Sequence, residues 1–115
     1  MAEARFFDAN HMEWTEHERF PGIRIKPLET RATHPAASVM LVRLGPGSVI
    51  EPHQHEKETE TAYVLAGQGT LTHGDHQTPV GPATGISIPP GLTHSLRNTG
   101  DELLDLIAIH TPPVR

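Results

Sequence analysis

Glycine and proline interrupt this chain so often that helices of ordinary length do not fit between the breaks. The 115 residues include 10 glycines and 11 prolines. The larger breaks are Pro21-Gly22, Gly45-Pro46-Gly47, Gly67-Gln68-Gly69, Gly81-Pro82 and Pro89-Pro90-Gly91. Both residue types disfavour a helix interior, and proline also removes a backbone donor. The spacing therefore favours a series of short strands.

The segments between these breaks are rich in β-branched residues, as strands are. They cover residues 23–25, 39–44, 61–65, 70–73, 86–88 and 103–109. Gly74-Asp75 is predicted to be the tip of a hairpin whose second strand begins near His76. A helical turn is expected only within residues 8–19. The pattern predicts an all-β sandwich or barrel that forms one domain over residues 1–115.

Composition excludes several classes of function. The chain has no cysteine, so thiol redox chemistry, iron–sulfur clusters and thiolate zinc sites are ruled out. Its formal charge of −5 and its lack of a lysine–arginine cluster argue against nucleic acid and anionic membranes as partners. Neither a secretory signal nor a long apolar run is visible, so a cytoplasmic protein is expected. Nine histidines make imidazole the best-supplied metal ligand.

One acidic, histidine-containing stretch is the strongest candidate for a site. Residues two apart on a strand project from the same face, so His53 and His55 are predicted to grip one ion together. A carboxylate would add charge neutralisation for a divalent cation. From the residues alone, Glu56, Glu58 and Glu60 compete for that role.

A fourth ligand must come from another part of the chain. His94 follows the rigid turn Pro89-Pro90-Gly91, which can set the direction of its side chain. His94 is therefore the candidate.

These residues resemble the two motifs of the cupin superfamily. The first motif, over 47–67, is matched by Gly47, His53, His55, Glu60 and Gly67. The second, over 85–98, is matched by Pro89, Gly91, His94 and Asn98. One position departs: Ala83 stands where the second motif begins with glycine, and Gly85 comes two residues later.

The resemblance implies a jelly-roll barrel, also called a double-stranded β-helix, of six to eight strands. It implies one divalent transition metal per chain, with Glu60 as the carboxylate ligand. The implied ligand set is His53, His55, Glu60 and His94. Nitrogen and oxygen donors suit manganese or iron, which we expect, and also nickel, cobalt, copper and zinc.

The remaining polar candidates are given simpler roles. Asn98 is expected to bond turn backbone. The other histidines, His11, His17, His34, His73 and His76, are expected to be non-ligating surface residues. His110 differs, because alternation along 104–110 places it on the interior face with Leu104, Leu106 and Ala108. We expect it to be an acid/base group at the barrel mouth, beside the metal ligands.

Four protein ligands leave two adjacent positions open on a metal that prefers six. This arrangement suits a bidentate small-molecule substrate and O₂, so the expected function is that of a dioxygenase-type oxidoreductase. Two alternatives stay open: a metal-dependent isomerase or lyase on a sugar acid or carboxylate, and a non-catalytic barrel that binds a small ligand.

The N-terminal arm, residues 1–20, carries an apolar load outside the motifs. It contains Phe6, Phe7, Trp14 and Phe20, four of the five aromatic residues. The arm caps its own barrel or covers a neighbouring subunit. Small cupins of this kind often pair, so a homodimer is expected.

Overall fold

Short strands form where the β-branched segments were predicted, and they build two antiparallel sheets. The computed structural model describes residues 2–115. Its strands are β1 (Thr15–Glu16), β2 (Arg24–Glu29), β3 (Ser38–Leu44), β4 (Val49–His53), β5 (Thr59–Ala66), β6 (Gly69–His73), β7 (His76–Val80), β8 (Gly85–Ile88), β9 (His94–Asn98) and β10 (Leu104–Thr111). The helical turn expected within residues 8–19 is a 3₁₀ turn, Ala9–His11, capped by the Asp8 side chain.

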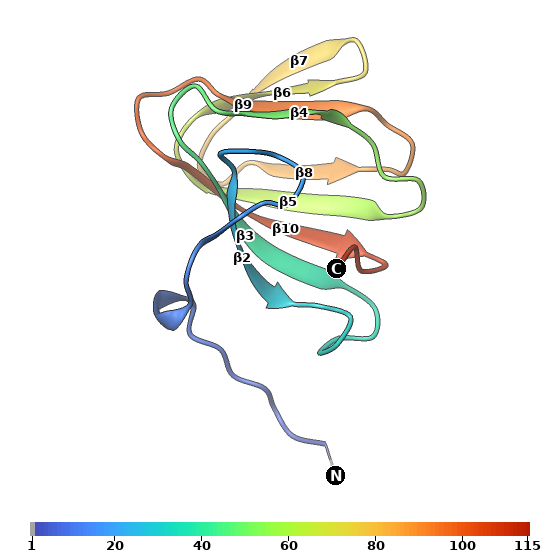
Figure 1. Ribbon diagram of the computed structural model, residues 1–115. Helices are drawn as coiled ribbons and strands as arrows, with labels where there is room; N and C mark the ends of the chain where they lie inside the picture. Colours follow the sequence, from blue (N-terminus) through green and yellow to red (C-terminus); the bar gives the residue numbers. More distant parts are fainter. Residues whose placement is uncertain (1) are drawn as a thin grey trace.

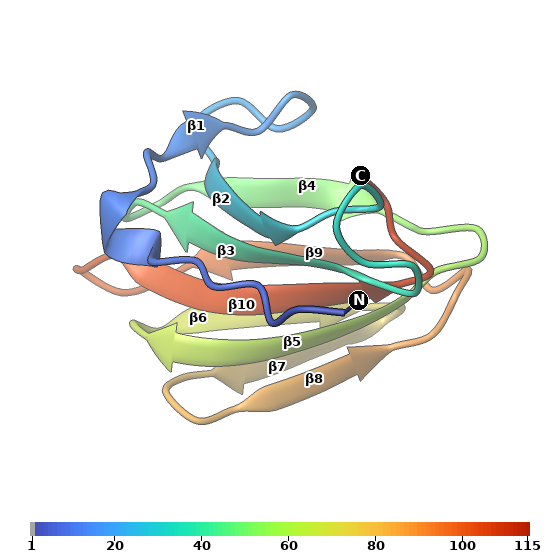
Figure 2. The same ribbon diagram turned by 90° about the horizontal axis from the view of Figure 1, so that it is seen from below.

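The two sheets face each other as in a jelly roll (Figures 1 and 2). One has the order β1-β2-β3-β10-β5-β8, and the other has the order β4-β9-β6-β7. The predicted all-β jelly-roll fold is confirmed. The hairpin is also as predicted, since His73 pairs with His76 across Gly74-Asp75.

The core lies between the sheets, where alternate residues of each strand point inward. Along β10 the inward residues are buried and the others are half-buried, apart from Thr111, which is exposed. Ile23, Ile25, Leu44, Val64 and Leu104 are almost fully buried. Burial of such side chains is worth about 1.5–3 kcal/mol each before conformational entropy is subtracted.

Asn98 ties the end of β9 to neighbouring backbone, as predicted. Its Nδ2 donates to the carbonyls of Leu44, at 2.9 Å, and Glu102, at 2.8 Å, while its Oδ1 accepts from the Gly100 amide. The side chain is 1% exposed. The bond to Leu44 is buried, and the other two are part-buried.

Ala83, the position that departs from the second motif, has a backbone conformation typical of glycine. Ala83 has φ of 68° and is the one non-glycine residue within 2–115 that has a positive φ. Its amide donates to the Val64 carbonyl at 2.9 Å. The backbone therefore adopts the left-handed conformation that glycine favours, with alanine in its place.

The arm packs partly on its own barrel. The Trp14 ring lies beside two cations, with Arg43 Cζ at 4.3 Å and Lys26 Nζ at 4.7 Å from its centroid. Phe20 is buried in the core. Phe6, in contrast, is 91% exposed. Within residues 2–115 we find no helix long and apolar enough to cross a bilayer.

Candidate metal centre

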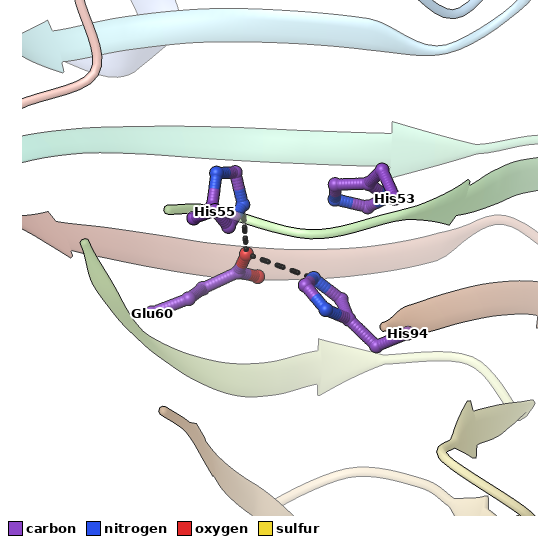
Figure 3. Close-up of side chains that lie close together, drawn as sticks. All are labelled: His53, His55, Glu60 and His94. Carbon is purple, nitrogen blue, oxygen red and sulfur yellow. Dashed lines mark hydrogen bonds and ion pairs between the residues drawn. The ribbon is translucent and has the colours of Figure 1, made fainter. Parts of the chain in front are cut away.

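The four predicted ligands converge from both sheets (Figure 3). His53 ends β4 and pairs with His94, which begins β9. Glu60 lies on β5 in the opposite sheet. One ligand atom from each of these side chains, together with one from His55, lies within 4.8 Å of the others. Glu56 and Glu58 are not in the group.

The prediction that His53 and His55 share one strand is wrong. Strand β4 ends at His53, and its pairing with β9 is irregular between Ile50 and His53. Pro52 lies in this interval and offers no amide to the ladder, which explains why regular pairing stops there. The chain nevertheless turns His55 back toward the site, and its ring centroid is 5.2 Å from that of His53.

Backbone carbonyls orient two of the imidazoles. His53 Nδ1 lies 2.8 Å from the Glu51 carbonyl, and His94 Nδ1 lies 2.9 Å from the Leu92 carbonyl. A carbonyl only accepts, so Nδ1 carries a proton in both rings, and in the neutral ring the lone pair is on Nε2. Such outer partners commonly fix the tautomer of a ligating histidine.

His94 Nε2 is the clearest sign that an ion fits here. The residue is 4% exposed, and this atom has no hydrogen-bond partner. Its nearest polar contact is Glu60 Oε1 at 3.5 Å, which is long for a hydrogen bond. A buried lone pair that faces two more imidazoles and a carboxylate is a fitting donor set for a divalent transition metal.

The electrostatics keep Glu60 and His53 in ligating form. Burial would raise the pKa of the Glu60 carboxyl, but the hydrogen bonds of His110 and His55 and the nearby His94 imidazole outweigh it and hold the pKa well below its usual value. Burial lowers the pKa of His53 to about 4, against the opposing effect of the Glu51 carbonyl. Near neutral pH, Glu60 is therefore charged and His53 is neutral.

Burial also acts to lower the pKa of His94. Its interactions with the Glu60 carboxylate and the Leu92 carbonyl outweigh that effect, and the pKa is raised. A cation that binds His94 must therefore displace a proton more readily held than in free histidine.

His110 lies where alternation along β10 placed it. It is 3% exposed and pairs with Glu60 in the register of β10 and β5. Its Nε2 lies 3.0 Å from Glu60 Oε1, and its Nδ1 is buried without a partner. The predicted interior placement is confirmed, and the side chain contacts the Glu60 carboxylate.

The four candidate ligands line a largely apolar cavity of about 320 Å³. Its wall includes Phe20, Met40, Val42, Leu71 and Leu96. Two groups of lining residues carry charge. One is the four-residue group, which includes Glu60, and the other consists of Glu18, Arg19 and Arg115. The cavity therefore offers a ligand polar contacts at separate places and an apolar surface between them.

Two predictions about the other histidines need correction. His17 is not a plain surface residue: it lines the cavity, with its ring 4.8 Å from that of Phe20. His34 is half-buried, and its Nδ1 accepts from the amides of Ala36 and Ala37. Its role is local, because it closes a turn.

The remaining three histidines lie outside the four-residue group, as expected. His11 and His76 are exposed. His73 is half-buried and hydrogen-bonds the Thr78 hydroxyl at 2.8 Å.

Sequence reasoning missed Arg115 as a cavity residue. It lies 98 positions from His17, and its Nη2 is 3.4 Å from His17 Nε2. No local pattern in the sequence signals a contact between residues so far apart.

The family profile described as "Cupin domain" matches residues 40–110. The "Oxalate-binding protein" of Thermotoga maritima is 31% identical over 83 residues, which are 71% of this chain and 69% of that protein.

Two solved structures show the same fold. The structure of a predicted oxalate decarboxylase from Thermotoga maritima has a TM-score of 0.86 at 24% identity, over 94% of this chain and 99% of that one. The structure of KdgF from Halomonas sp. has a TM-score of 0.84 at 23% identity, over 96% and 94% of the two chains.

Proposed function

This chain belongs to the cupin domain family, and on that premise we propose that it is a metal-dependent enzyme of the dioxygenase type acting on a small organic substrate. The observation that carries the proposal is the four-residue donor group, with the buried, unpartnered His94 Nε2, in the wall of an apolar cavity. His53, His55, Glu60 and His94 would hold the metal. When bound, iron or manganese would supply Lewis acidity and two adjacent positions for substrate and O₂.

The protein residues would perform three tasks. His53 and His94 present Nε2 because backbone carbonyls hold their Nδ1 protons. Glu60 supplies a negative charge. His110 donates to Glu60 Oε1 from a buried position, so it can hold a proton next to the ligand set without being a ligand.

The apolar wall favours this reaction class over the sugar-acid alternative. A sugar acid carries several hydroxyl groups, each of which needs a hydrogen-bond partner when buried. Between its two polar regions the cavity is lined by side chains such as Met40, Leu71 and Leu96, which provide none. A substrate with an apolar body fits better.

A redox-neutral reaction on a carboxylate is the second candidate. The names of two similar proteins support it, since one is called oxalate-binding and the other a predicted oxalate decarboxylase. The buried pair of His110 and Glu60 also supports it, because such a reaction needs proton transfer rather than O₂.

One experiment separates these functions. Protein loaded with Fe(II) or Mn(II) is incubated with a panel of enols, diols, thiols and small carboxylates such as oxalate, and both O₂ consumption and product are measured. O₂ uptake coupled to product, lost in His94→Ala, is the expected result. Product without O₂ uptake would establish the redox-neutral reaction, and tight binding without any product would refute the enzyme proposal.

We also propose that the chain forms a homodimer through its arm. Phe6 and Phe7 of the arm are both exposed by more than two-fifths. Such exposed apolar side chains are consistent with a surface that another copy covers.

A further inference from the structure

Three buried side-chain atoms within residues 2–115 have no hydrogen-bond partner, and all three belong to residues that line the same cavity. Two are His94 Nε2 and His110 Nδ1 at the metal centre, and the third is Arg115 Nε. Buried polar groups in proteins are nearly always paired, so each unpaired one marks a place where a partner is missing. The proposed metal centre explains the first two, because both atoms belong to residues of that centre. Arg115 marks a second polar place in the cavity.

The segment that carries Arg115 is anchored to residues from an earlier part of the chain. The backbone of its segment is anchored by two bonds, from Arg31 N to the Arg115 carbonyl at 2.8 Å and from Val114 N to the buried Ser38 hydroxyl at 3.0 Å. The side chain is 20% exposed and reaches the cavity beside His17. The cation is therefore held in place before any ligand binds.

Glu18 accepts hydrogen bonds from two nitrogens of this guanidinium. Arg115 Nη2 lies 2.9 Å from Glu18 Oε1, and Nη1 lies 3.1 Å from Glu18 Oε2. The Glu18 side chain is 65% exposed. A pair with so exposed a partner contributes little to stability, because water competes for the carboxylate. Glu18 is thus a carboxylate that another carboxylate can replace at small cost.

The way from Arg115 to the metal centre runs along aromatic rings. His17 contacts the guanidinium at 3.4 Å, Phe20 lies 4.8 Å from His17, and His53 lies 5.0 Å from Phe20, both between ring centroids. A ligand that contacts both Arg115 and the metal centre would therefore need an apolar part between its anionic group and its metal-binding group.

From this arrangement we propose that Arg115 is a substrate-binding residue, and that the ligand of the cavity is an organic acid with an apolar body whose carboxylate displaces Glu18 from the guanidinium. Arginine suits this task because its planar fork matches a carboxylate with two parallel hydrogen bonds. The inference rests on the proposed function only in taking this cavity as the substrate site.

The test compares 3-phenylpropanoate with uncharged 3-phenylpropanamide. Their dissociation constants are measured by NMR titration on zinc-loaded protein, so no turnover is required. Arg115→Gln should weaken binding of the acid about tenfold or more, as expected for loss of charged hydrogen bonds, and leave the amide unchanged. Arg19→Gln is the matched control, because Arg19 also lines the cavity, stacks on Phe20 and carries the same charge.

Glu18→Gln gives the sharper result. If Glu18 competes with the ligand, its removal should tighten binding of the acid severalfold. If the Arg115–Glu18 pair is only a structural tie, both substitutions should lower the melting temperature and neither should distinguish acid from amide. Either that outcome, or a larger loss in Arg19→Gln than in Arg115→Gln, would overturn the proposal.

The zinc content of each protein keeps the two proposals apart. Protein that takes up no metal contradicts the proposed function whatever Arg115 does. Protein that holds metal but binds the acid equally well with and without Arg115 contradicts this inference alone.

Discussion

Truncation of two residues of β9 should affect two different properties of the protein. His94 begins the strand and faces the metal centre, whereas Asn98 ends it and bonds only to backbone. The comparison of His94→Ala with Asn98→Ala therefore separates metal binding from framework stability within one short strand.

The expected loss in Asn98→Ala follows from its three hydrogen bonds. An intramolecular hydrogen bond contributes about 0.5–1.5 kcal/mol to the free energy of unfolding, so the three together contribute about 3 kcal/mol. The substitution also leaves the carbonyls of Leu44 and Glu102 without these donors. A small domain is stable by only about 5–15 kcal/mol, so this loss is large. It should be the same with and without metal.

His94→Ala should instead remove the stabilisation that metal provides. A ligand at 100 times its dissociation constant stabilises the native state by about 2.7 kcal/mol. That increment should be present in the original protein and in Asn98→Ala, and absent in His94→Ala.

The assay is urea unfolding of each protein at two metal conditions, with chelator and with excess Mn(II) or Zn(II). The metal increment is the difference between the two free energies of unfolding for one protein. Our reasoning is refuted if His94→Ala keeps the increment, or if Asn98→Ala loses it.

Four further predictions follow from other parts of the structure. In metal-free protein, the depressed pKa of His53, about 4 when folded against 6.5 when unfolded, means that the unfolded state binds more protons between these values. The free energy of unfolding should then fall as pH drops from 6.5 to 4, and it should fall less steeply in His53→Gln. Ala83→Gly should raise the unfolding free energy by up to about 1 kcal/mol in urea denaturation, because glycine relieves the positive φ but also gains freedom when unfolded. Glu60→Gln should lower the metal content measured by elemental analysis, while Glu58→Gln should retain it; equal losses would contradict the assigned carboxylate. Removal of residues 2–8, which include Phe6, should convert a dimer to a monomer in light scattering after gel filtration, whereas an unchanged mass would refute the role of the arm.

Local features of the sequence were enough to locate the strands and most of the candidate ligands. Proline and glycine act on the backbone where they stand, so the breaks between strands could be predicted without knowledge of the fold. Motif spacing singled out Glu60 over Glu56 and Glu58, and alternation along 104–110 placed His110 inside. Each of these inferences depends on neighbours within a few positions or on one family pattern.

Only the tertiary structure decided what stands around those ligands. In the structure His55 lies beyond the end of β4, Glu60 pairs with His110, and His17 and Arg115 lie together at the cavity. These contacts join residues 50 and 98 positions apart. They depend on the register of β5 with β10 and on how the two sheets close over the core, and such long-range geometry leaves no periodic trace in the residues themselves.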